Sequence, residues 1–140
     1  MITRSPRAAG FRGALLISIF FMAAAHGIAA AAPAPCTPLL QVFFAADFKD
    51  QQYQQKVYQR VATSWLRPAT SPQPNGKTVV IAIIARDGRV APPIVNLKSG
   101  SDAWDAAALA AVKKAAPFEP LPQSYPRPSV EVHFHFACAG

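Results

Sequence analysis

Two histidines near the C-terminus are spaced as metal ligands on a β-strand sometimes are. His133 and His135 lie two positions apart in the run SVEVHFHFAC, so a β-strand there would place both imidazoles on one face. A structural zinc site needs about four ligands, and no cysteine or carboxylate joins the pair at a recognisable spacing. We therefore interpret the histidines as part of a solvated strand face and expect neither a metal nor a cofactor. The alternative is a secreted metal- or ligand-binding protein that uses His133 and His135.

Four hydroxyl and carboxylate side chains cluster just before and inside an alanine-rich segment. They are Ser99, Ser101, Asp102 and Asp105. Serine nucleophiles also need a histidine base, and no motif places one beside this cluster. Helix capping accounts for all four residues, because serine and aspartate are favoured at the start of a helix. We therefore expect no catalytic residue and a protein that is not an enzyme.

The only two cysteines lie at opposite ends of the chain that would remain after export. Cys36 and Cys138 would then meet an oxidising compartment, where an even number of cysteines indicates pairing. A bridge would close a loop of about a hundred residues and stabilise the fold by roughly 4 to 5 kcal/mol on the chain-entropy model. We predict the disulfide Cys36–Cys138, with two unpaired thiols as the alternative that bond geometry must exclude.

The N-terminus has the pattern of a targeting segment. Three arginines precede residues 13–32, which carry no charge and end in a small-residue run with Ala-x-Ala cleavage sites. We predict a cleaved signal peptide over residues 1–32 and a periplasmic location. A retained inner-membrane anchor is the alternative, since some twenty uncharged residues can just span a bilayer, and contact with the membrane is expected only in that case.

Charge argues against a nucleic-acid partner. The whole chain has 14 basic and 7 acidic residues, a net charge of +7, and loss of the leader lowers it to about +4. The remaining basic residues are scattered and form no dense run. We interpret them as a solvated surface.

The first half of the exported chain predicts a helix and a hairpin. Apolar residues recur at four-residue spacing from Tyr53 to Trp65, which indicates an amphipathic helix that Asp47 caps and Arg67-Pro68 ends. The run TVVIAIIA then predicts a strand, and Asp87-Gly88 predicts a hairpin turn. Pro92-Pro93 places the second strand of the hairpin at a sheet edge.

The second half predicts a short helix and a long final strand. The segment DAWDAAALAAVKKAA has a capping residue, Ser101 or Asp102, with acidic residues in its first turn and lysines in its last. Five prolines then keep the chain extended up to residue 128. From Val130 to Cys138 apolar and polar residues alternate, which predicts a strand that buries Cys138.

These elements predict an α+β domain over residues 47–140. Its order is α-β-β-α-β, with two helices packed on one face of a three-stranded antiparallel sheet. Residues 33–46 are expected to form an extended N-terminal segment, in which the run LLQVFF at 39–44 is too short to classify by its period.

The order and spacing of several short motifs resemble the C-terminal domain of the TonB and TolA families. The motifs are Trp65-Leu66-Arg67-Pro68, the Asp87-Gly88 turn, Ser99-Gly100, the segment from Trp104 to Leu109, the segment from Pro117 to Pro122, and the closing strand VEVHFHF. The similarity covers about residues 53–136. It implies a periplasmic domain that engages envelope proteins, in the case of TonB to energise outer-membrane transport.

The resemblance and the expected sheet together suggest a binding mode. If the proline-bearing strand forms one edge, the last strand forms the other, where an extended peptide of an envelope protein could add by main-chain hydrogen bonds. The residues expected to contact it are Ser129, Glu131, His133 and His135. The strand predicted from the run TVVIAIIA is apolar on both faces, and the helices can cover only one of them. Its other face is either a partner or homodimer face or is covered by residues 39–44.

The short segment between the apolar leader and the first helix bears on whether the protein is a stand-alone module or a membrane-anchored transducer. Only some twenty residues separate the apolar leader from the first helix, roughly 70 Å when fully extended, with no stiff spacer to cross a periplasm. We therefore expect a stand-alone, non-enzymatic protein-binding module in the cell envelope. The alternative is an inner-membrane-anchored energy-transducer component of transmembrane transport.

Overall fold

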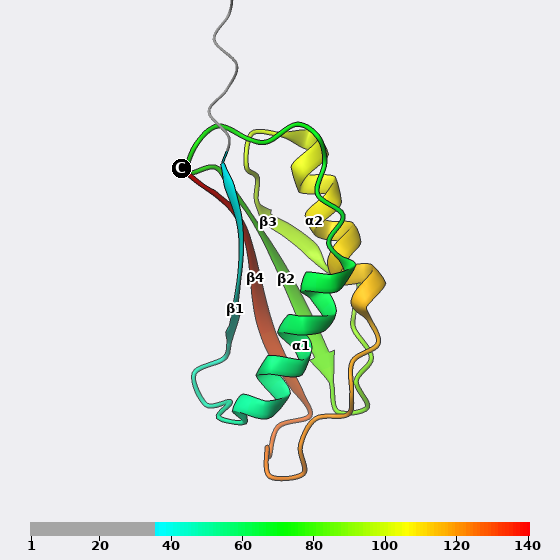
Figure 1. Cartoon of the computed structure of the whole chain (residues 1–140). Helices are drawn as coiled ribbons and strands as arrows, with labels where there is room; N and C mark the ends of the chain where they lie inside the picture. Colours follow the sequence, from blue (N-terminus) through cyan, green and yellow to red (C-terminus); the bar gives the residue numbers. More distant parts are fainter. Residues whose placement is uncertain (1–35) are drawn as a thin grey trace, which may run out of the picture. The chain divides into compact units, whose positions relative to one another are not determined.

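The computed structural model describes residues 36–140, and the predicted leader lies outside this range. The described chain runs through β1 (Thr37–Phe44), α1 (Gln51–Ser64), β2 (Lys77–Ala85), β3 (Ile94–Leu97), α2 (Asp102–Ala115) and β4 (Ser129–Ala139). The strands form one antiparallel sheet in the order β1-β4-β2-β3, and both helices lie on the same face of it (Figure 1). The predicted α+β class is confirmed, but the sheet has four strands rather than three. Within residues 36–140, neither helix is long and apolar enough to cross a bilayer.

The additional strand, β1, changes the position of β4 in the sheet. The two strands pair along the whole of β1, from Thr37 opposite Ala139 to Phe44 opposite Val132. The prediction that the last strand forms an edge is therefore wrong, because an apolar run of the same chain satisfies the row of N–H and C=O groups that β4 would otherwise expose. β1 lies beside β4 and does not cover the outer face of β2.

The hairpin of β2 and β3 agrees with the sequence-based prediction. β3 is a short edge strand, preceded by Pro92-Pro93, and its register with β2 shifts between Val79 and Val80. Gly88 in the turn has φ of +88°, a conformation that favours glycine. A Cβ atom at this position would lie 2.1 Å from the carbonyl oxygen of Phe118, so the turn also needs glycine for space.

The helices bury the faces that their periodicity indicates. In α1 the buried residues are Tyr53, Val57 and Val61, and in α2 they include Trp104 together with small alanines that let the helix lie close to the sheet. Ser101 caps α2, and its side chain accepts from the backbone N–H of Trp104. Asp50, not Asp47, caps α1. The turn before α1 buries Phe48 in the core, and Asp47 instead forms a salt bridge with Arg127.

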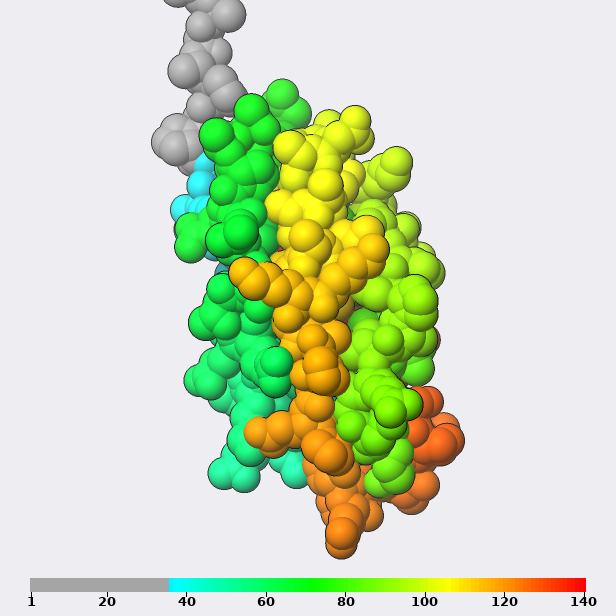
Figure 2. Space-filling view, turned by 90° about the vertical axis from the view of Figure 1, so that its right-hand side faces the viewer, coloured from blue at the N-terminus to red at the C-terminus, as the bar shows by residue number. Residues whose placement is uncertain are grey.

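The proline-rich segment between α2 and β4 is part of the core. It runs between α1 and the β2–β3 hairpin, as the orange residues in Figure 2 show. Its apolar side chains Phe118, Leu121 and Tyr125 are buried. The Tyr53 hydroxyl donates to the carbonyl of Glu119, and burial together with the Glu119 carboxylate raises the pKa of Tyr53 to about 12. The segment therefore joins α1 to the hairpin as well as delivering the chain to β4.

Candidate functional site

The two edges of the sheet differ in how readily another strand could join them. β3 has only four residues and follows two prolines, which cannot donate to a ladder. β1 has eight residues, and none from Thr37 to Ala46 is charged. Charged residues, bulges and very short strands are the usual protection of an edge against strand addition. Leu39 to Phe44 has none of these, so β1 is the edge that is open to another strand within residues 36–140.

Hydrogen bonds at the two ends of β4 show which way its backbone groups point. The Cys138 N–H donates to the Gly76 carbonyl and the Cys138 carbonyl accepts from Asn75, so the backbone of Cys138 faces the β2 side. The Glu131 carbonyl accepts from the N–H of Ala45 at 3.2 Å, so the backbone of Glu131 faces the β1 side. Because this direction alternates along an antiparallel strand, the odd-numbered residues of β4 bind β1.

The same alternation identifies the unpaired groups of β1. Its odd-numbered residues lie opposite the odd-numbered residues of β4 and point their N–H and C=O groups toward them. The groups of Leu40, Val42 and Phe44 therefore point away from the sheet, and within residues 36–140 no strand pairs with them. This edge offers three N–H donors and three carbonyl acceptors to an extended chain.

The four residues predicted to contact a partner lie on the helix-free face of the sheet, the open face. Glu131 and His133 are joined by a 2.6 Å contact between Oε1 and Nε2. The ring of His135 lies 4.7 Å from that of Phe43 on β1. Ser129 lies beyond the end of the β1–β4 ladder, opposite Ala85 of β2. The structure thus brings His133 and His135 together with β1 and leaves Ser129 at the far end of β4.

The open face combines these polar residues with exposed apolar side chains. Its large hydrophobic residues are between 37% and 58% exposed, and they are Leu39, Phe43, Ile83, Ile94 and Leu97. Phe43 and Leu39 belong to β1, where the sequence analysis expected no element. The run LLQVFF was the only sign of this strand in the sequence. Because it has apolar residues at both odd and even positions, it did not indicate which residues would face the open side of the sheet.

His135 is less basic on this face than a free imidazole. Its pKa is lowered by burial first, and then by the positive charge of Lys77 on β2 and the neighbouring His133. The imidazole therefore tends to stay neutral and packs against Phe43.

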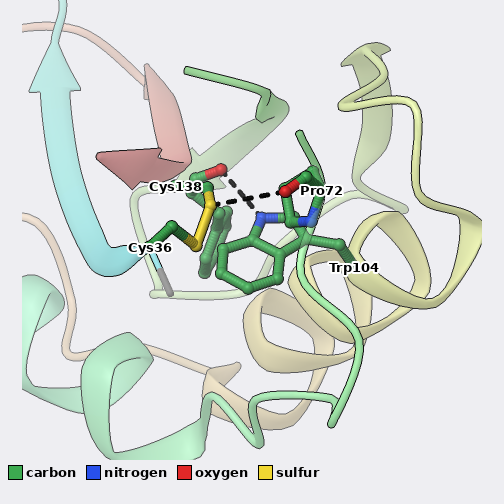
Figure 3. The surroundings of a disulfide bond; sticks show 5 residues. Cys36, Pro72, Trp104 and Cys138 are labelled. Carbon is green, nitrogen blue, oxygen red and sulfur yellow. Dashed lines mark hydrogen bonds between the residues drawn. A yellow bond between two sulfur atoms is a disulfide. The ribbon is translucent and has the colours of Figure 1, made fainter. Parts of the chain in front are cut away.

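The predicted disulfide is present and fastens the start of β1. Cys36 and Cys138 are bonded, with their Cα atoms 5.1 Å apart. Figure 3 shows the bond beside Trp104 and Pro72. The Trp104 Nε1 donates to the carbonyl of Phe136 at 3.0 Å, and the Cys138 sulfur lies 3.6 Å from the Pro72 carbonyl. The bond holds β1 and β4 together at the end of their ladder.

The serine and aspartate cluster has a structural role that differs in part from the expected one. Only Ser101 caps the helix, whereas Asp105 is buried and accepts hydrogen bonds from the Thr78 hydroxyl and from the N–H and hydroxyl of Ser99. Burial alone would raise the pKa of Asp105, but these hydrogen bonds and Lys98 hold it below its ordinary value. The carboxylate thereby ties the start of α2 to β2 and to the segment after β3.

Comparison with known proteins identifies the family. The sequence model of the family described as TonB C terminal matches residues 50–136. Among solved structures, the TonB C-terminal domain of Helicobacter pylori is 22% identical, with a TM-score of 0.53 over 67% of this chain and 86% of that one. TolA domain III, solved with a bound peptide from the N-terminus of TolB, is 20% identical, with a TM-score of 0.51 over 65% of this chain and 77% of that one. No curated protein matches significantly. The chain belongs to the TonB C-terminal domain family.

Proposed function

We propose that this domain is a non-enzymatic protein-binding module of the cell envelope, and that it binds an extended segment of an envelope protein by strand addition to β1. The observation that carries this proposal is the row of outward N–H and C=O groups at Leu40, Val42 and Phe44 in an uncharged edge strand. Main-chain hydrogen bonds at such an edge supply affinity that does not depend on the partner's sequence.

The family supports binding of a protein or peptide as the general function. TolA domain III shares this fold and was solved with a peptide derived from TolB. For the present chain we infer a partner of the same kind, a protein segment from the envelope. The edge that we propose differs from the one expected from the sequence, because β1 already occupies that side of β4.

The open face extends the proposed contact beyond the backbone. An added strand would place every second side chain on this face, next to Phe43 and Leu39. We propose that Glu131, His133 and His135 contact longer partner side chains that reach over β1. Ser129 is the least favourably placed of the four predicted residues, since the β1–β4 ladder ends before it.

A periplasmic location follows from the proposed leader. We propose that residues 1–32 are removed on export and that the domain acts in the periplasm. Mass spectrometry of the exported protein tests this cleavage, and the expected mass is that of a chain beginning near Pro33. An intact N-terminus would instead support the anchored transducer component, and the edge of β1 would still be available to a partner.

A proline at position 42 tests the mode of binding. Val42→Pro removes one outward N–H that the fold does not use, and Gln41 already has the extended backbone that a residue before proline prefers. The matched control Val42→Thr keeps the N–H and a side chain of similar shape. In pull-downs from envelope extract we expect Val42→Thr to recover the wild-type partner and Val42→Pro to recover about tenfold less.

The fold of each variant needs a check before recovery is interpreted. Urea denaturation should give both variants a cooperative transition, because Val42 is only half-buried and lies at the edge. Equal recovery of the same partner by two folded variants would contradict strand addition at β1.

A further inference from the structure

A groove lies on the helix side of the β1 edge. It has a volume of about 370 Å³. Val42 and Phe44 line it from β1, and the residues that line it from α1 are Gln51, Gln54, Gln55 and Tyr58. The groove therefore lies directly beside the outward N–H and C=O groups of Val42 and Phe44.

The helix contributes a polar stripe because its apolar stripe is used elsewhere. Positions 51, 54, 55 and 58 follow the spacing i, i+3, i+4 and i+7, so they share one face of α1. Tyr53, Val57 and Val61 form the neighbouring stripe and are buried against the sheet. Three amides and a phenol are thereby left facing the groove.

An added strand would direct half of its side chains over this groove. Side chains alternate between the two faces of a strand, and neighbouring strands place opposite residues on the same face. Val42 and Phe44 point to the helix side, so the partner residues opposite them would do the same. The two partner residues opposite Val42 and Phe44 would therefore meet the glutamine stripe, and the residue between them would lie on the open face beside Phe43.

The lining of the groove favours uncharged, hydrogen-bonding side chains. None of the six lining residues is charged. Lys56, the nearest cation along α1, forms a salt bridge with Glu119 at 2.9 Å, and Asp50 accepts from the N–H of Tyr53 as a helix cap. A charged partner side chain would therefore find no opposite charge among the lining residues of the groove.

The amides can both donate and accept. The Gln54 Nε2 donates to the carbonyl of Phe48 at 3.1 Å, which fixes that amide and leaves its Oε1 as an acceptor. Gln51 and Gln55 are exposed, and each offers a donor and an acceptor, as does the hydroxyl of Tyr58. Amide and hydroxyl side chains of a partner match this set, while Val42 and Phe44 accommodate their aliphatic carbons.

We propose that the β1–α1 groove is a specificity site that selects Asn, Gln, Ser or Thr at alternate positions of the extended partner segment. This inference rests on the proposed strand addition to β1. The groove proposal adds which side chains the partner carries and which of its alternating positions they occupy.

Selection from a library of random decapeptides tests this inference. The library is displayed on ribosomes and selected against the immobilised full exported chain. We compare the wild type with Gln51→Lys/Gln55→Lys in the groove and with Gln52→Lys/Gln59→Lys. The second pair adds the same charge to α1 at exposed positions that do not line the groove.

The expected result is a change of specificity confined to the groove variant. The wild type should enrich Asn, Gln, Ser and Thr at two positions that are separated by one residue. The groove variant should enrich Asp and Glu there, and it should bind the wild-type peptides about tenfold more weakly. The control pair should select the same peptides as the wild type.

Two other outcomes would overturn the inference, and they differ in what they say about strand addition. If Val42→Pro abolishes binding of the selected peptides but the groove variant selects the same residues as the wild type, strand addition holds and the groove has no role in specificity. If no selected peptide depends on Val42, the proposed function itself is wrong, and the groove proposal fails with it.

Discussion

Phe43 and His135 pack together on the open face beside the β1 edge. The two rings lie 4.7 Å apart and come from different strands. The sequence indicated that His133 and His135 share a strand face, and the structure confirms this. Phe43 could not be placed in the same way, because the run LLQVFF has no polar alternation to mark its outer side.

The lowered pKa of His135 predicts a stability that depends on pH. Its pKa in the folded protein lies below the 6.5 of a free imidazole, because of burial, Lys77 and His133. The unfolded chain therefore binds a proton more readily, so the free energy of unfolding should fall as pH drops below 6.5 toward the folded pKa. Urea denaturation at about pH 7.5 and about pH 5 measures this fall.

A substitution separates this effect from the titration of other groups. His135→Gln should make the decline smaller, whereas His133→Gln, which keeps His135, should retain more of it. If His135→Gln leaves the decline between the two pH values unchanged, burial of the imidazole has no effect on stability.

Among the helices and strands, β1 is the one that the sequence did not predict. The helices, the hairpin and β4 all carry strong periodic or turn signals, and each forms where those signals lie. β1 carries no such signal, because its run LLQVFF lacks regular polar alternation. The predicted disulfide could have indicated where the residues of β1 lie. If Cys36 bonds to Cys138 in the last strand, the residues after Cys36 must begin beside that strand.

Removal of the disulfide tests how β1 is held. The bond joins residues 102 positions apart, so Cys36→Ala/Cys138→Ala should lower the free energy of unfolding by about 4 kcal/mol. The ladder between β1 and β4 should then fray from Thr37. Amide hydrogen exchange of Leu39 and Gln41 should accelerate in the variant, and equally in the reduced wild type. Unchanged exchange would show that packing alone holds β1.

In the whole domain, β1 lies outside β4, so β1 rather than β4 forms this edge of the sheet. The family match begins at residue 50, so β1 lies before it in the chain. The fold class, the two helices, the hairpin and the disulfide could all be predicted from the sequence. The second edge could not be predicted, because it depends on the pairing of β1 with β4, between residues about ninety positions apart, with no local signal.

Photo-crosslinking in cells can show directly whether a partner occupies the β1 edge. A benzophenone amino acid replaces Gln41 on β1 or Leu97 on β3 in the full chain, and both positions are exposed. We expect irradiation to join the Gln41 variant to an envelope protein and to leave the Leu97 variant without that product. Adducts from position 97 and none from position 41 would place the partner at the opposite edge, and strand addition to β1 would be wrong.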